Sequence, residues 1–283
     1  MMRPDSSIRG RFIALVISAI IPVFGWSMYQ DWQDSELDLN AARSNLKLAA
    51  SLGAANQDRV SEGARQLLVA LATIGSISRD DTASCGQKLG QLRKQFPEYV
   101  SLGVVDEFGT IKCDTVNNLG TVSIARHPFY QRAQATGRFL VGEYSNGLLS
   151  RQPIVGFAYS LQPDRNARSP VVFAALDLAQ LTASLRQVDV PAGARVSVLD
   201  RALRVLGTTD PNVQIGTLLP VMPDPDVVAQ TARGAATVTD VGDLSTGRIV
   251  ALAPVRVAGE LAFYVAASME RDKVIGPNVE SLV

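Results

Sequence analysis

Residues 99–113, YVSLGVVDEFGTIKC, form the stretch that decides the fold. Their apolar and β-branched residues predict a strand that ends at Asp106, and the turn residues 107–109 predict a reversal into a second strand. The same plan returns at residues 194–207, ARVSVLDRALRVLG, where Asp200 precedes the turn. This recurrence predicts two α+β units of similar architecture.

Each predicted strand pair is followed by helices and further strands. In the first unit, Pro128 suits the first turn of a helix and Gly137 suits its end. The other elements expected there are strands at 138–143, 153–161 and 171–176 and a helix at 177–186. Those expected in the second unit, after a junction at 191–193, are a helix at 223–233, strands at 235–241, 248–257 and 261–268, and a helical tail at 270–283.

An apolar run without charges occupies residues 12–29, near the start of the chain. Such a run is just long enough to cross a bilayer. Arginines precede it and acidic residues follow it, which places residues 1–11 in the cytoplasm and everything from about residue 31 in the periplasm of a bacterium. The alternatives are a cleaved secretory signal, although no A-x-A site follows the run, and a buried core helix.

A long helix is expected over residues 30–78. One set of residues recurs every seven positions, and a second set runs beside it, as in a coiled-coil seam. The sets are Leu39, Leu46, Gly53, Val60, Leu67 and Ile74, and Ala42, Ala49, Asn56, Gly63, Ala70 and Ile77. We expect the membrane-distal part of the seam to pack on its own domain and the membrane-proximal part on a second copy, which makes a homodimer. The alternative is a seam that packs only on its own domain.

The composition excludes several classes of function. The chain has 283 residues with 27 basic and 27 acidic ones, so no electrostatic footprint for nucleic acid exists. His127 is the single histidine and no C-x-x-C is present, which argues against a transition-metal site. No G-x-S-x-G, H-E-x-x-H or phosphate-binding loop occurs. The sequence therefore predicts no catalytic residues and no cofactor in this region.

Two cysteines, Cys85 and Cys113, are present. An even number in an exported protein suggests a disulfide, here one that would join a helix or loop after the long helix to a strand. The alternative is two free thiols.

The order and spacing of these segments resemble the double-Cache family of extracytoplasmic sensor domains. The resemblance is carried by residues 96–106, 127–130, 142–144 and 171–178. It implies a fold with a transmembrane helix, a long signalling helix and two PAS-like antiparallel-sheet modules. By this resemblance residues 79–190 form the membrane-distal module, residues 191–270 the membrane-proximal module, and residues 271–283 a helix toward a second membrane segment.

The resemblance also implies a ligand site in the distal module. In amino-acid-binding members, an Arg-Pro-Trp-Tyr motif holds the ligand, with help from a later Asp. Here the positions that match are His127, Phe129, Tyr130 and Asp177, and Tyr144 lines up with a further pocket tyrosine. Histidine lacks the planar fork with which arginine binds a carboxylate, so an α-amino acid ligand is doubtful, although Arg126 could compensate.

Each of these residues also has a simpler interpretation. His127 could be a solvent-facing residue at a helix start, and Phe129, Tyr130 and Tyr144 could be core residues. Asp177 could cap a helix. The ligand itself stays open among a small organic acid, a neutral metabolite and an unrelated cue.

The resemblance implies the periplasmic ligand-sensing region of an inner-membrane receptor. In such receptors the cytoplasmic output beyond residue 283 is a histidine kinase, a diguanylate cyclase or phosphodiesterase of cyclic-di-GMP signalling, or a chemotaxis signalling helix. We expect one of the first kinds, a histidine kinase or a cyclic-di-GMP enzyme. The alternative is an anchored periplasmic module that binds a protein partner and has no output domain. A third possibility, an exported hydrolase, has only scattered acidic residues to support it.

Overall fold

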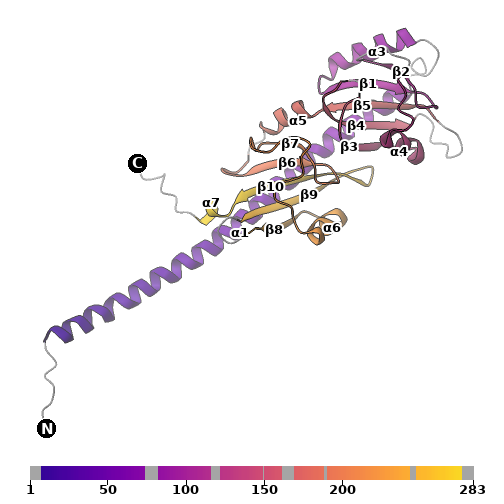
Figure 1. The fold of residues 1–283 in the computed structure, drawn as a ribbon. Coiled ribbons are helices and arrows are strands. Elements are labelled where there is room, and N and C mark those ends of the chain that lie inside the picture. The colour runs from indigo at the N-terminus through magenta and orange to yellow at the C-terminus, as the bar shows by residue number, and fades with distance from the viewer. Residues whose placement is uncertain are drawn as a thin grey trace.

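One long helix carries two sheet modules in this computed structural model (Figure 1). The structure describes residues 8–73, 82–115, 122–148, 150–160, 169–187, 190–242 and 247–275, without the side chains of 8–36 and 82–83. Helix α1, Ile8–Thr73, passes behind both modules and projects past the second one toward its N-terminus (Figure 1). The predicted long helix is thus present, and the part of it at residues 74–78 lies outside the described residues.

The predicted membrane anchor belongs to the first part of α1. No helix among the described residues is long and apolar enough to cross a membrane. The span predicted at residues 12–29 lies where the side chains are outside the described residues, so it stays a prediction.

The buried stripe of α1 follows the first predicted seam. Leu39, Leu46 and Leu67 are buried in one core cluster with both sheets. The expectation that the membrane-proximal part of this seam packs on a second copy is wrong for Leu39 and Leu46, because they pack within their own chain. The homodimer itself stays a prediction. In the second set Asn56 and Gly63 are exposed, since a straight helix of 3.6 residues per turn drifts away from a seven-residue repeat.

The two sheets have the same strand order. In the distal module the order is β2-β1-β5-β4-β3, and in the proximal module it is β7-β6-β10-β9-β8. The distal strands are β1 (Tyr99–Val105), β2 (Ile111–Asp114), β3 (Leu140–Asn146), β4 (Pro153–Ser160) and β5 (Val171–Asp177). The proximal strands are β6 (Arg195–Leu199), β7 (Val205–Thr208), β8 (Thr237–Val241), β9 (Arg248–Val257) and β10 (Glu260–Glu270). All of the pairings are antiparallel, which confirms the predicted α+β architecture.

The hairpins that open the modules match bond for bond. In the distal module Asp106 N donates to Thr110 O, and in the proximal one Asp200 N donates to Arg204 O. Further along, Leu102 N donates to Thr115 Oγ1, as Val196 N does to Thr209 Oγ1. The duplication predicted from the sequence is therefore present at the level of individual hydrogen bonds, and it provides a counterpart for most positions of the distal sheet.

Helices cover both faces of the sheets. Helix α1 packs on one face, mainly on β9, β10, β4 and β5. Helix α4, Pro128–Thr136, contacts the distal sheet. Helix α6, Pro225–Arg233, contacts the proximal sheet. Gly137 ends α4 in the left-handed conformation, as predicted from its position. The other helices are α3 (Thr82–Gln95), α5 (Leu178–Leu185) and α7 (Asp272–Ile275).

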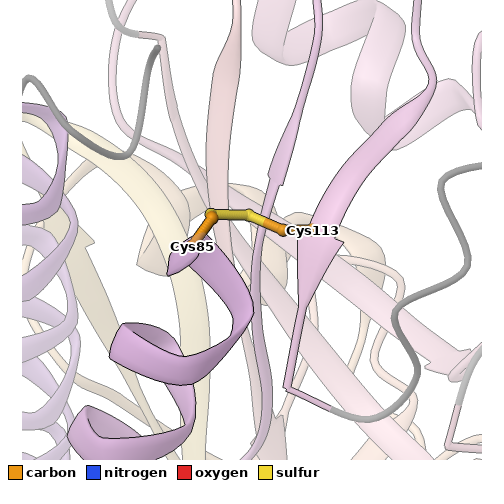
Figure 2. Close-up of a disulfide and its surroundings, with 2 residues drawn as sticks. All are labelled: Cys85 and Cys113. Atoms are coloured by element: carbon orange, nitrogen blue, oxygen red, sulfur yellow. A yellow bond between two sulfur atoms is a disulfide. The ribbon is translucent and has the colours of Figure 1, made fainter. Parts of the chain in front are cut away.

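A disulfide ties the edge of the distal module together. Cys85, near the start of α3, is bonded to Cys113 of β2, and both side chains are buried (Figure 2). This is the pairing that the sequence predicts. The two cysteines are separated by 28 residues, and closing a loop of that length in the unfolded chain corresponds to about 3–4 kcal/mol of stabilisation.

Candidate functional site

Small residues lie side by side across the distal sheet. Ser101 of β1 pairs with Ala175 of β5, and Ala175 pairs with Gly156 of β4. On β3 the ladder continues through a bulge that contains Gly142. We call these four residues the small-residue row. Because none of them has a long side chain, they leave space above the middle of the sheet, and all four line the same cavity.

Two phenylalanine rings wall this space. A methyl group added at Gly156 would lie 2.9 Å from Phe129 Cζ, and one added at Gly142 would lie 3.1 Å from Phe129 Cδ2. The Phe129 ring of α4 therefore rests directly on two strand glycines. Phe173 of β5 covers Gly103 in the same way, since a methyl group there would lie 2.4 Å from Phe173 Cε1. These glycines are needed for the close approach of the rings.

The cavity has a volume of about 360 Å³, which falls within the roughly 300–1,000 Å³ of small-molecule sites. Ser101 forms part of its floor, is 3% exposed, and has an Oγ without a hydrogen-bond partner. A buried polar atom left unpaired costs about 1–3 kcal/mol, and such an atom in a cavity is a natural partner for a ligand. Sequence reasoning missed Ser101, because a serine in an apolar strand belongs to no motif.

His127 and Arg126 precede α4. His127 lines the cavity, and it also caps α4, because its Nδ1 accepts a hydrogen bond from Phe129 N over 3.3 Å. Its exposed imidazole thus agrees with both predicted roles. Arg126 is exposed and is not among the residues that line the cavity. Arg132, one turn into α4, does line it.

Tyr130 and Asp177 have local partners instead. Tyr130 is buried, and its hydroxyl donates to Asp106 O over 2.9 Å and accepts from Gln134. Asp177 caps α5, since its Oδ1 accepts from Ala179 N over 2.8 Å. Neither residue lines the cavity. The structure therefore places both in the simpler roles, a core tyrosine and a helix cap.

Tyr144 lines the cavity and also touches the proximal module. Its backbone N–H donates to Asp200 Oδ2 over 3.1 Å. A methyl group added at Gly216 of the proximal module would lie 2.4 Å from Tyr144 Cζ. Beside it, Glu143 Oε1 accepts from Arg201 Nη2 over 2.8 Å. Two adjacent residues of the cavity wall are thus bonded to the β6–β7 turn of the other module.

The proximal module fills the counterpart of this cavity. Where the distal sheet pairs Ser101, Ala175 and Gly156, the proximal sheet pairs Arg195, Ser268 and Val250. These residues are larger, and the cavity that they line has only about 20 Å³, enough for about one water molecule.

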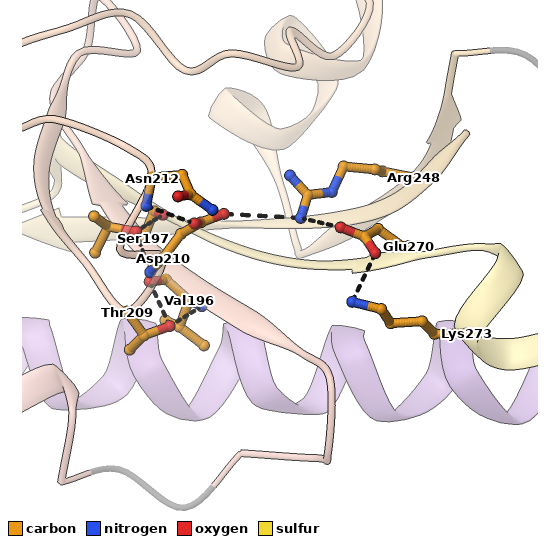
Figure 3. Close-up of polar contacts among 9 residues, drawn as sticks. Val196, Ser197, Thr209, Asp210, Asn212, Arg248, Glu270 and Lys273 are labelled. Atoms are coloured by element: carbon orange, nitrogen blue, oxygen red, sulfur yellow. Dashed lines mark hydrogen bonds and ion pairs between the residues drawn. The ribbon is translucent and has the colours of Figure 1, made fainter. Parts of the chain in front are cut away.

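A chain of ion pairs includes Arg248 and Asp210, which line the proximal counterpart (Figure 3). Arg248 lies 3.8 Å from Asp210 and 3.5 Å from Glu270, which in turn pairs with Lys273 over 2.7 Å. The Lys273 ammonium, hydrogen-bonded to Glu270, lowers the pKa of that carboxyl. Within the described residues, no group of three or more His, Cys, Asp or Glu side chains could hold a metal ion.

A long helix that carries two similar antiparallel sheets is the fold that the sequence resemblance to double-Cache sensor domains implies. The extracellular domain of a protein assigned as a histidine kinase, rpHK1S-Z16, superimposes with a TM-score of 0.69 at 16% identity, over 84% of this chain and 98% of that one. The resemblance predicted from the sequence is therefore confirmed for the fold.

Two chemoreceptor ligand-binding domains have the same fold. That of Pseudomonas fluorescens CtaA, in complex with L-isoleucine, has a TM-score of 0.64 at 16% identity and covers 85% of this chain and 97% of its own. That of Pseudomonas aeruginosa PAO1 PctB, in complex with L-Arg, has a TM-score of 0.64 at 17% identity and covers 84% and 99%. No protein-family profile and no curated protein matches the sequence.

Proposed function

We propose that this chain is the extracytoplasmic sensor region of a bacterial membrane receptor and that it binds a small molecule in the distal cavity. The observation that carries the proposal is the contrast between the modules. In the distal module, this position of the sheet is a cavity of about 360 Å³ beside the unpaired Ser101 hydroxyl. In the proximal module, larger side chains fill the equivalent position.

The fold supports a sensing role. The chemoreceptor domains of similar fold are described in complex with L-isoleucine and L-Arg, and rpHK1S-Z16, assigned as a histidine kinase, has an extracellular domain of this fold. We propose the same location for residues 31–275 and a histidine kinase, or a diguanylate cyclase or phosphodiesterase, as the output. On this proposal the region binds and signals, and any catalysis belongs to the output domain.

The contacts of Tyr144 and Glu143 give a route for the signal. A ligand in the cavity would touch these residues, and they are bonded to Asp200 and Arg201 of the proximal module. The proximal module is in turn tied to α1, because Arg43 pairs with Asp240 over 2.5 Å. A ligand shifts a receptor only by its differential affinity for two states, so on this proposal the two states differ in these contacts.

A thermal-unfolding screen of the full chain in detergent tests the proposal. The panel holds amino acids, organic acids, polyamines and purines. A ligand at about a hundred times its dissociation constant stabilises by ~2.7 kcal/mol, which is several degrees. We expect the shift to disappear in Gly156→Val, which copies the proximal Val250 and displaces Phe129, and to persist in Val250→Ala.

The outcomes separate the two functions considered. A shift that survives Gly156→Val, in a variant whose circular dichroism is unchanged, would place the site elsewhere. No shift with any compound would favour the module that binds a protein partner.

A further inference from the structure

The two oppositely charged side chains that line the distal cavity have different ion-pair partners. Its lining contains one acidic side chain, Glu143, and one arginine, Arg132, which approach to 3.5 Å. Glu143 is also paired with Arg201, over the shorter distance of 2.8 Å. Arg201 therefore compensates most of the Glu143 charge from the proximal module. Arg132 therefore keeps donors for another acceptor.

An ammonium group would find no dedicated partner here. Asp177, the residue that the resemblance assigns to this role, does not line the cavity and caps α5 through Oδ1. Glu143 already pairs with two guanidinium groups, those of Arg132 and Arg201, so its negative charge is not available to an ammonium group. The cavity thus lacks a free carboxylate among its described lining residues.

Apart from His127, Tyr144 and several short polar side chains, the remaining lining is apolar. Phe129, Phe173 and Ile154 surround the small-residue row, and the buried Ser101 Oγ offers a single hydrogen-bonding group on the floor. A ligand with an apolar body gains by burial between the rings, at roughly 25 cal/mol per Å² of apolar surface. A hydroxyl or carbonyl oxygen on the same ligand would satisfy Ser101.

We infer that the cavity takes a small carboxylate with an apolar body and a second, hydrogen-bonding oxygen, rather than an α-amino acid. Arg132 binds the carboxylate, for which its planar fork is suited, and Ser101 binds the second oxygen. Phe129 and Phe173 hold the body. This inference rests on the proposed function and specifies the ligand class of the same site.

Isothermal titration of the full chain in detergent tests the inference with three compounds of similar shape and different charge. They are 4-methyl-2-oxopentanoate, L-leucine and 3-methylbutylamine. We expect the oxo acid to bind most tightly. Arg132→Gln should weaken its binding about 10- to 100-fold, because a hydrogen-bonded charge pair is lost, and Ser101→Ala about 5-fold. Arg126→Gln, a matched change outside the cavity, should leave the affinity unchanged.

Three results would overturn the inference. They are tighter binding of L-leucine or the amine than of the oxo acid, no binding of the oxo acid, and equal losses in Arg126→Gln and Arg132→Gln. If L-leucine binds best and Gly156→Val abolishes its binding, only the ligand class is wrong and the distal sensor site stands. If a compound binds equally well to Gly156→Val and wild type, the proposed function fails as well.

Discussion

The backbone N–H of Tyr144 donates a hydrogen bond to Asp200 Oδ2 over 3.1 Å, so that a residue of the distal cavity is bonded to a buried carboxylate of the proximal module. Asp200 has a counterpart, Asp106, in the distal hairpin. Both accept two N–H groups of their own turn through Oδ1. The additional bond to the Tyr144 N–H, made through Oδ2, distinguishes Asp200 from its counterpart.

This difference predicts unequal effects of the same substitution. Asp200→Ala should lower the free energy of unfolding by about 1–3 kcal/mol more than Asp106→Ala, because it also leaves the Tyr144 N–H unpaired. Urea denaturation followed by circular dichroism measures both. Equal losses in the two variants would mean that the bond between the modules adds nothing to stability.

A second pair of variants tests the packing between the modules. Gly216 and Gly259 have similar positive φ angles, +87° and +84°, so alanine adds about the same backbone strain at each, roughly 1–2 kcal/mol. At Gly216 the new methyl group also meets the Tyr144 ring, whereas at Gly259 it meets no atom within 4 Å.

We therefore expect Gly216→Ala to cost about 1–3 kcal/mol more than Gly259→Ala in urea denaturation. Displacement of Tyr144 should also reduce the affinity of whichever compound stabilises the wild type in the thermal screen. If both variants bind that compound as the wild type does, Tyr144 is not coupled to the site.

The buried phenol of Tyr99 should make the free energy of unfolding fall at alkaline pH. Burial raises the pKa of its phenol above the ordinary value of 10.0, and the Glu98 carboxylate adds to this. The unfolded chain therefore loses this proton at a lower pH than the folded chain does. The contribution of Tyr99 to stability is complete below about pH 10 and is lost as the pH rises above it.

The measurement is the free energy of unfolding between neutral pH and alkali. Tyr99→Phe should reduce the alkaline loss, because phenylalanine cannot ionise. An alkaline loss of the same size in Tyr99→Phe and wild type would contradict the assignment.

We propose a specific surface for the predicted homodimer. Leu48 and Leu52 lie one turn apart on α1 and are 58% and 61% exposed. We expect α1 to pair with a second copy along this stripe, and Leu48→Glu with Leu52→Glu to give monomers in sedimentation equilibrium. Leu218→Glu, an exposed leucine outside α1, is the control. A wild-type monomer at all concentrations, or the same effect in the control, would contradict the prediction.

The architecture could be predicted from the sequence because its signals are local. The strand of residues 99–105, its turn and their recurrence at 195–208 depend on neighbouring residues, and the observed strands have nearly the predicted bounds. For the seam of α1, the first set of residues was predicted correctly and the second was not. The buried face of a helix depends on the pitch of the whole helix and on the sheets that pack against it.

The site was harder to predict because it depends on contacts between distant segments. Tyr130 and Asp177 match the family pattern in order, yet their partners are Asp106 O and Ala179 N. Ser101 became a candidate only when the register placed it beside Ala175 and Gly156. Such a row of small residues has no signature in a single sequence.

Hydrogen–deuterium exchange of the full chain tests the central claim, a small-molecule site in the distal cavity, most directly. The chain is measured with and without the compound that gives the largest shift in the thermal screen. We predict slower exchange in α4 and β3, the Tyr144 amide included, and no change in α6, the proximal counterpart of α4. Protection confined to the proximal module, or no protection with any compound of the panel, would contradict the account.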